Sequence, residues 1–412
     1  MHYSENNPIC YFAETNFRNK RNQFGIYLED RLYHFYILGK TGTGKTTLLQ
    51  TKVLQDIIEG HGICLLDVHG DLVSKVQNLI PEHRIDDVVY LDATNPNMLL
   101  GYNPLRKVSY EKRSLVTSNI LEIFQHLWGN QSWGMKLSHI LRNVLLTLLD
   151  QKQATFSDIL RLLQDTDYRN KCLPNIINPD VRNFWEKEFK NYSPKSDLIP
   201  IYNKLGGILS YPSVKRILVS NKEQISLRQI MDEGKILLVN FSKGALGTDA
   251  SYILGSLLLT SLASAAFSRI DTPLHQRRPF FCYLDEFQNY TTASLIDMLS
   301  ELRKFKLGLV MAHQYISQLD PKIRDAVLGN VGSIVCFRLG QADARFMTKE
   351  FYPTFEAIDF VNLANYEIYL KLMISGSPSK AFSASTITTS QIARLFSLLH
   401  NSRSAINYFK TS

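Results

Sequence analysis

The sequence predicts an α/β fold in which a mostly parallel β-sheet is flanked by helices and interrupted by an inserted all-α domain. In residues 25–108 and 232–390, short apolar runs alternate with helical segments, an alternation that is typical of parallel sheets. Between them, in residues 109–231, apolar side chains recur at helical spacing. With 412 residues, the chain is long enough for one large domain with an insertion or for two domains.

Within residues 25–108, the sequence of residues 32–49, LYHFYILGKTGTGKTTLL, predicts a strand, a glycine-rich loop and a helix. The pattern G-x-x-x-x-G-K-[ST] predicts a phosphate-binding loop, because its glycines let backbone N–H groups converge on an anion. The lysine reaches the β- and γ-phosphates, and the threonine hydroxyl is a suitable Mg²⁺ ligand. We therefore expect a nucleoside triphosphate and Mg²⁺ as cofactors, bound by Gly39, Lys40, Thr41, Gly42, Thr43, Gly44, Lys45, Thr46 and Thr47.

Two more strands are expected in this stretch, over residues 63–66 and 88–91. The first is followed by Asp67, His69 and Asp71, and ligand groups gather at the carboxyl ends of parallel strands. The same residues also fit a turn into a helix that Asp71 caps. The sequence leaves both interpretations open.

The inserted residues 109–231 mix basic with aromatic side chains, and such a mixture can bind single-stranded or non-specific DNA. The alternative is an ordinary solvated surface over core aromatics. The residues in question are Lys187, Lys190, Lys195, Lys204, Lys215, Arg216 and Lys222, with Trp185, Tyr192, Tyr202 and Tyr211. The net charge of +8 suits a polyanionic partner, but many proteins are as basic.

After the insertion, residues 235–241 and 280–284 predict strands, and the second is followed by two acids. At such a position one carboxylate can hold the Mg²⁺ shell and a neighbouring one can draw a proton from the attacking water. Asp285 fits the metal role and Glu286 fits the role of general base. A strand over residues 307–314 then ends at Gln314, whose amide could contact the γ-phosphate or orient the water.

Arg303 ends the helix that follows the two acids, on a part of the core expected to face outward. From there it could serve a neighbouring subunit's nucleotide as an arginine finger. A helix C-terminal charge that favours the helix dipole is the other interpretation.

The sequence also predicts the structure of the two ends of the chain and of its most apolar segment. Residues 1–24 are expected to form an irregular extension, and residues 391–412 a C-terminal helix. Residues 252–267 are apolar but short for a membrane span, so a buried core helix is expected. The five cysteines show no paired spacing, which indicates reduced, mostly buried thiols of a cytoplasmic protein.

Five segments resemble the HerA/FtsK superfamily of P-loop motors, and more narrowly the ATPase part of type IV secretion coupling proteins, which drive conjugative DNA transfer. They are GKTGTGKTTL, LLDVHGDL, FFCYLDEFQNY, LRKFKLGLVMAHQYISQL and IRDAVLGNVGSIVCFRLGQADARFMTKEF. The resemblance covers most of residues 24–385 and implies a RecA-like P-loop NTPase core in a hexameric ring, with ATP sites between subunits and DNA in the channel. On the matching residues it assigns Lys45 and Thr46 to nucleotide and Mg²⁺, Asp285 to Mg²⁺, Glu286 to the general base, Gln314 to the sensor and Arg303 to the finger.

The resemblance also implies partners, namely DNA, a relaxase or secretion-channel components. Many coupling proteins begin with membrane-spanning helices, which are not expected here, so recruitment to the inner face of the membrane by a partner is the corresponding expectation. Two alternative functions remain, a protein-transporting secretion ATPase and a cytosolic HerA-like DNA translocase or helicase. A non-catalytic scaffold is disfavoured because it would need no general base.

Overall fold

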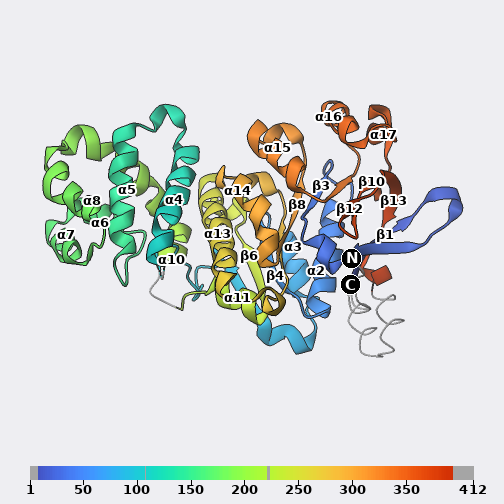
Figure 1. The fold of residues 1–412 in the computed structure, drawn as a ribbon, viewed down its shortest axis with the longest axis horizontal. Coiled ribbons are helices and arrows are strands. Elements are labelled where there is room, and N and C mark those ends of the chain that lie inside the picture. Colours follow the sequence, from blue (N-terminus) through green and yellow to red (C-terminus); the bar gives the residue numbers. More distant parts are fainter. Residues whose placement is uncertain (1–7, 107, 220–222, 393–412) are drawn as a thin grey trace. The chain divides into compact units, whose positions relative to one another are not determined.

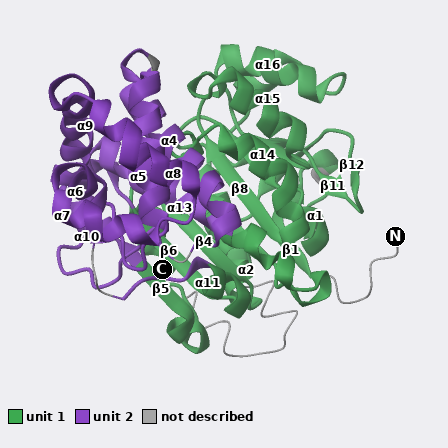
Figure 2. Cartoon of the chain, turned by 60° about the vertical axis from the view of Figure 1, so that its left-hand side comes forward, with its two compact units in different colours: residues 1–90, 228–240, 265–412 green, residues 91–227, 241–264 purple. Residues whose placement is uncertain are grey.

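The computed structural model describes residues 8–106, 108–219 and 223–392, which form two compact units (Figure 2). Unit 1 consists of residues 1–90, 228–240 and 265–412, and unit 2 of residues 91–227 and 241–264. The insertion expected over residues 109–231 falls in unit 2 except for residues 228–231. Unit 2 also takes in residues 241–264, so the chain passes into it twice.

In the described residues, eleven strands form one sheet (Figure 1). In spatial order they are β2 (Gln23–Tyr27), β1 (Ile9–Thr15), β13 (Phe382–Thr386), β10 (Glu367–Lys371), β9 (Ser333–Cys336), β3 (Phe35–Leu38), β8 (Leu307–His313), β7 (Phe280–Leu284), β4 (Gly62–Asp67), β6 (Ile236–Asn240) and β5 (Val88–Asp92). The run from β9 to β6 is parallel. Its strands are buried along their length, which explains their continuous apolar sequences. Their carboxyl ends therefore meet at one edge of the sheet.

The other side of the sheet is antiparallel, and here the expectation for residues 1–24 is wrong. β1 pairs with β2 and with β13, and β13 pairs with β10. Cys10 and Phe12 point into the core, which makes β1 a half-buried strand. An irregularity in the pairing between Tyr11 and Ala13 breaks the alternation that would reveal β1 in the sequence. A two-stranded hairpin, β11 (Met373–Ile374) and β12 (Ser377–Pro378), lies outside this sheet.

Helices of unit 1 pack on the sheet through apolar faces. On α2 (Lys45–Ile58), Leu48, Val53 and Ile57 are buried in the same apolar cluster as Phe35 and Ile37 of β3. In the described part of this unit, further helices are α1 (Leu28–Arg31), α3 (Asp71–Gln77), α11 (Leu227–Glu233), α14 (Ser294–Glu301), α15 (Pro321–Asn330), α16 (Gln341–Phe351) and α17 (Ala357–Asn362). The helix expected over residues 391–412 lies almost wholly outside the described residues.

Unit 2 is helical. It contains α4 (Arg113–Trp128), α5 (Met135–Leu149), α6 (Asp158–Gln164), α7 (Thr166–Cys172), α8 (Pro179–Asn183), α9 (Ile199–Ser210), α10 (Pro212–Val219) and α12 (Lys243–Leu246). Trp185 is buried, and its indole N–H donates to the Thr147 hydroxyl at 2.7 Å. Trp185 therefore belongs to the core of unit 2 and cannot stack on DNA bases. This contradicts, for Trp185, the interpretation that the basic and aromatic residues between Trp185 and Lys222 bind DNA.

The apolar residues 252–267 lie in α13 (Thr248–Ser268), which begins in unit 2 and ends in unit 1. Among the described residues, this helix is long and apolar enough to cross a membrane by length and composition alone. However, 78% of its apolar window is buried inside the protein, as expected for a core helix. The five cysteines are all buried and free, as expected from their unpaired spacing.

Candidate functional site

The phosphate-binding loop connects β3 to α2, as its sequence predicts. Gly42 and Gly44 have φ angles of 76° and 122°, which side chains rarely adopt, so the loop needs glycine at both positions. Gly39 is needed for a different reason, because a Cβ atom there would lie 2.6 Å from the Cβ atom of Phe337. The helix start and the curled loop together make an anion-binding cradle.

Lys45 holds the centre of this cradle. Its ammonium group donates to the carbonyl oxygens of Gly39 at 2.6 Å and Lys40 at 3.0 Å. Burial lowers the pKa of Lys45, and the nearby carboxylates of Glu286 and Asp285 act in the opposite direction. The predicted phosphate ligand and the predicted acid pair are therefore close enough to interact electrostatically.

Asp285 and Glu286 follow β7 at the edge of the sheet where β3 also ends. Both are buried, at 6% and 7% exposure. The pKa of Asp285 is raised to about 6, first by burial and then by the charges of Asp67 and Glu286, while Lys45 and His69 act in the opposite direction. Carboxylates crowded in this way favour a divalent cation, so the donor set at Asp285 fits the predicted Mg²⁺.

Glu286 has a left-handed backbone, with φ 52° and ψ 54°. Such a conformation is uncommon for a residue other than glycine, and neighbouring contacts hold it. The side-chain amides of Asn289 and Gln288 donate to its carbonyl and its carboxylate, both at 2.7 Å. The carboxylate of the predicted general base is thus fixed in direction.

Gln314 links this acid to the phosphate-binding loop. Its side-chain N–H group donates to the Glu286 carboxylate, and its carbonyl oxygen accepts the Thr41 hydroxyl at 3.0 Å. Residues that are far apart in sequence therefore form one chain of hydrogen bonds from the loop to the acid. Lys45, Asp285, Glu286 and Gln314 all lie at one edge of the sheet.

Asp67 lies at the same edge and has a role that the sequence interpretation missed. Its carboxylate accepts the backbone N–H groups of His69 at 2.8 Å, Leu72 at 2.8 Å and Val73 at 3.1 Å. Asp67, rather than Asp71, therefore ties down the start of α3, while Asp71 and His69 are exposed. The position of Asp67 at the end of an apolar strand could have indicated this role. The sequence interpretation instead named Asp71, four residues later, as the cap.

Arg303 is not part of this cluster. It lies in the turn before β8, whereas Gln314 follows the same strand, so the two residues are at opposite edges of the sheet. Its guanidinium group stacks over the Tyr33 ring, 3.4 Å from the ring centroid. Arg303 is exposed and cannot reach a nucleotide on its own chain's loop.

A second group of possible metal ligands, Asp56, Glu59 and His61, lies at the end of α2. Asp56 is already paired, because Arg31 donates to its two oxygens at 2.6 and 2.5 Å. The Tyr283 hydroxyl donates to the same carboxylate. This buried pair joins α1 to α2 and stabilises the core, so Asp56 is not free to bind a cation.

The basic and aromatic residues between Trp185 and Lys222 are only partly suited to binding DNA. The Arg216 guanidinium donates to the carbonyl oxygens of Ala93 and Pro96, both at 3.3 Å, and so has a structural role. Lys204 lies over the Trp128 ring, 5.1 Å from its centroid. Lys222 lies outside the described residues.

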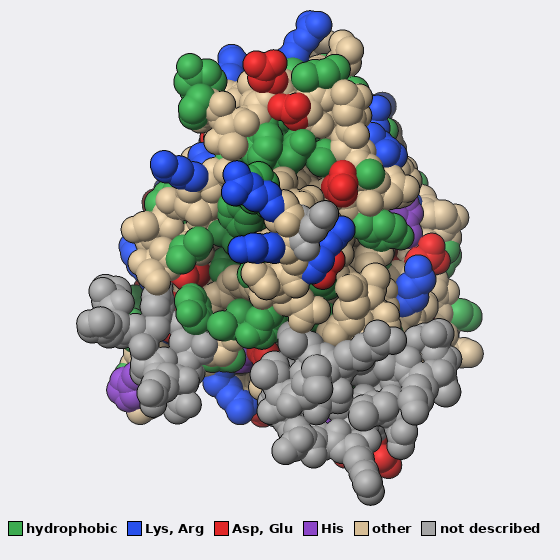
Figure 3. Space-filling view, turned by 90° about the vertical axis from the view of Figure 1, so that its right-hand side faces the viewer, with side chains coloured by type: hydrophobic (Ala, Val, Ile, Leu, Met, Phe, Trp, Pro, Cys, Tyr) green, Lys and Arg blue, Asp and Glu red, His purple; other side chains and the backbone are tan. Residues whose placement is uncertain are grey.

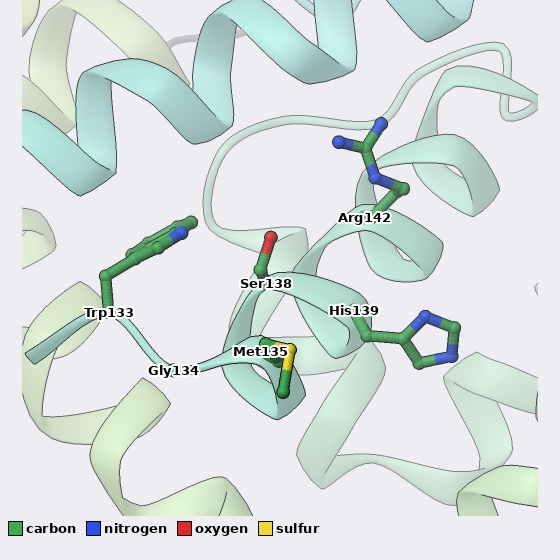
Figure 4. A pocket seen from close by; sticks show the side chains of 6 residues that line it. All are labelled: Trp133, Gly134, Met135, Ser138, His139 and Arg142. Carbon is green, nitrogen blue, oxygen red and sulfur yellow. The ribbon is translucent and has the colours of Figure 1, made fainter. Parts of the chain in front are cut away.

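Unit 2 also has an open pocket of about 320 Å³ at the start of α5, which the sequence did not indicate (Figure 4). It is lined by Trp133, Gly134, Met135, Ser138, His139 and Arg142. Arg142 donates to the Ser118 hydroxyl, a neutral partner, at 3.2 Å, and His139 lies 3.2 Å from Glu188. The pocket therefore combines an aromatic ring with a guanidinium group.

Comparison with known proteins identifies the fold. No protein-family model matches the sequence, and neither does any protein with a curated description. Among solved structures, the plasmid coupling protein TrwB bound to the GTP analogue GDPNP has a TM-score of 0.65 at 15% identity, covering 94% of this chain and 97% of TrwB. TrwB with ADP and Mg²⁺ has a TM-score of 0.64 over the same shares of the two chains. VirB4 of Thermoanaerobacter pseudethanolicus has a TM-score of 0.59 at 14% identity, covering 94% of this chain and 98% of VirB4. The likeness confirms the fold that the resemblance implied: the chain has the RecA-type P-loop fold of the coupling protein TrwB and of VirB4.

Proposed function

We propose that this protein is a Mg²⁺-dependent ATPase that moves DNA, of the type that couples DNA to a type IV secretion or conjugation channel. The observation that carries the proposal is the hydrogen-bonded chain Thr41–Gln314–Glu286 beside Lys45 and Asp285. A phosphate-binding loop alone would serve a kinase or a switch. A buried acid pair connected to the loop through a glutamine is suited to triphosphate hydrolysis.

Each residue has a role in this proposal. The loop N–H groups and Lys45 bind the phosphates, while Thr46 and Asp285 hold Mg²⁺. Glu286 accepts a proton from the attacking water, and its fixed direction favours one water position. Gln314 touches both the acid and the loop, so it can report whether a γ-phosphate is present.

The coupling role is supported by likeness along almost the whole chain. TrwB is described as a bacterial conjugative coupling protein, and it has been solved with ADPNP, GDPNP, and ADP with Mg²⁺. By extension, we propose that this chain assembles as a homo-oligomeric ring, a hexamer, with ATP sites between subunits. Arg303, which cannot reach its own chain's loop, would then serve a neighbour's site. The ring would act in the cytoplasm, recruited to the inner face of the membrane by a channel component or a relaxase.

DNA would be bound electrostatically. Among the described residues on the face in Figure 3, Lys and Arg side chains occur singly or in small groups among other side chains and form no continuous basic surface. The pocket of Trp133 and Arg142 in unit 2 offers a stacking ring and a phosphate partner. It is the place where we propose single-stranded DNA to be contacted.

The test is ATP turnover by the purified full chain, with and without single- and double-stranded DNA, at low and moderate salt. Stimulation by DNA that fades as salt rises is the expected result, because phosphate contacts weaken with salt. Replacing Trp133 and Arg142 by alanine should remove the stimulation by DNA and leave the basal turnover. The matched control is the exposed, acid-paired Lys304→Ala, which should retain full stimulation.

A second function is favoured by the match to VirB4, which covers a share of the chain as large as that covered by TrwB. In that case the protein is a secretion ATPase that moves protein substrates. Its turnover would be indifferent to DNA at every salt concentration and would respond to a protein partner. A cytosolic DNA translocase, in contrast, would be stimulated by DNA without any membrane partner.

A further inference from the structure

Tyr366 lies against the phosphate-binding loop and was not singled out by the sequence. Its backbone N–H group donates to the Thr43 carbonyl at 2.8 Å. A Cβ atom on Gly44 would lie 2.9 Å from Cδ1 of the tyrosine ring, so the ring touches the start of α2. The residue is nevertheless 47% exposed. One part of the ring therefore packs on the loop, and the rest is open to solvent.

The backbone of Tyr366 is held in an unfavourable conformation. Its φ angle is 68°, in the left-handed region that aromatic residues rarely occupy. Its carbonyl oxygen accepts the backbone N–H of Thr386 at 2.8 Å and the Thr386 hydroxyl at 3.2 Å. On the preceding residue, the Asn365 side chain accepts from the Arg338 guanidinium at 2.9 Å. Strained residues fixed from several sides are concentrated at ligand sites.

The sheet order places Tyr366 on the nucleoside side of the loop. Glu286 and Gln314 follow β7 and β8, which lie on one side of β3. Tyr366 precedes β10, on the other side of β3, and β10 runs antiparallel to β9, so its start lies at the edge where β9 and β3 end. A triphosphate with its γ end at the acid and the glutamine has its nucleoside end directed toward β9 and β10.

We infer that Tyr366 is the platform on which the base of the bound nucleotide stacks, an inference that rests on the proposed nucleotide binding. The contact is with the π-face of the base, which every base has, so it adds affinity without selecting adenine over guanine. Tyr366 is a binding residue in this role and has no part in the chemistry.

The experiment measures equilibrium binding, by calorimetry with Mg²⁺, of three probes to the full chain: non-hydrolysable analogues of ATP and GTP, and inorganic tripolyphosphate. Tyr366→Asn removes the ring while keeping a residue that tolerates the left-handed backbone. Tyr366→Phe keeps the ring. Tyr110→Asn, at 48% exposure in unit 2, is the matched control.

The expected result is that Tyr366→Asn weakens both nucleotide analogues about tenfold, within the range for loss of one base stack, and leaves tripolyphosphate unchanged. Tyr366→Phe and the control should bind all three probes like the original chain. The inference is overturned if Tyr366→Asn binds the nucleotides normally, or if it loses tripolyphosphate equally, since the tyrosine would then only support the loop. If the original chain binds none of the probes, the proposed function itself fails.

Discussion

Gln314 donates its side-chain amide to the Glu286 carboxylate, although the two residues are 28 positions apart and follow different strands. The same side chain accepts the Thr41 hydroxyl of the phosphate-binding loop. This residue therefore has contacts with both parts of the proposed hydrolytic site.

Replacing Gln314 by alanine should lower ATP turnover about 100-fold and change nucleotide affinity little, because it removes the hydrogen-bonded connection and leaves the phosphate cradle intact. Single-turnover kinetics beside equilibrium binding would separate the effect on turnover from the effect on affinity. The exposed Gln318→Ala is the control, and a Gln314→Ala protein with normal turnover would contradict the assigned role.

Glu286→Gln should lower ATP turnover by roughly 10² to 10⁴, the factor that a general base supplies. The same two measurements apply to this variant.

Arg303→Ala should fold and bind nucleotide normally but lose turnover by roughly 10³-fold or more, because a finger acts on the neighbour's transition state. Mixing it with Lys45→Ala chains should restore part of the activity, since one chain supplies the arginine and the other the intact loop. The neighbouring Lys304→Ala should keep its activity. If mixing restores nothing while both variants form mixed rings, Arg303 serves only to stack on Tyr33.

Asp285→Asn should stabilise the nucleotide-free protein at pH 8 and have little effect at pH 4. The pKa of Asp285 is raised from 3.8 to about 6, so the folded protein binds a proton more tightly than the unfolded chain between these values. The free energy of unfolding therefore falls as the pH rises through this window, by about 3 kcal/mol at most. Urea unfolding at both pH values tests this, with the exposed Asp71→Asn as control. An equal effect at both pH values would mean that ionisation of Asp285 costs no stability.

Arg31→Met should destabilise unit 1 by about 3–5 kcal/mol, because it leaves the Asp56 carboxylate buried without its partner. The double variant Arg31→Met, Asp56→Asn should recover more than half of this loss while keeping a partner for the Tyr283 hydroxyl. Chemical denaturation gives both values. Arg21→Ala, which removes an exposed ion pair with Glu14, should change stability by less than about 1 kcal/mol. No recovery in the double variant would show that Arg31 acts through packing on Phe281 instead.

The parallel half of the sheet could be predicted from the sequence because its strands are buried on both faces and appear as unbroken apolar runs. The loop, Asp285, Glu286 and Gln314 could be predicted because each follows such a run. β1 could not, because its alternation is interrupted between Tyr11 and Ala13, and because one of its two partner strands, β13, follows more than 350 residues later. Contacts such as Tyr366 to Thr43 depend on the order of strands in space, which no local pattern carries.

The two hydrogen bonds from Lys45 to the carbonyls of Gly39 and Lys40 have a consequence for the speed of binding. They hold the loop in its curled form with the ammonium group directed inward, so an arriving phosphate meets a finished cradle. Association then requires one lysine side chain to exchange its carbonyl partners for phosphate oxygens, and the loop backbone keeps its conformation. The rate of nucleotide binding should therefore be limited by diffusion. The rate at which a bound product is replaced by a new nucleotide should be limited by product dissociation.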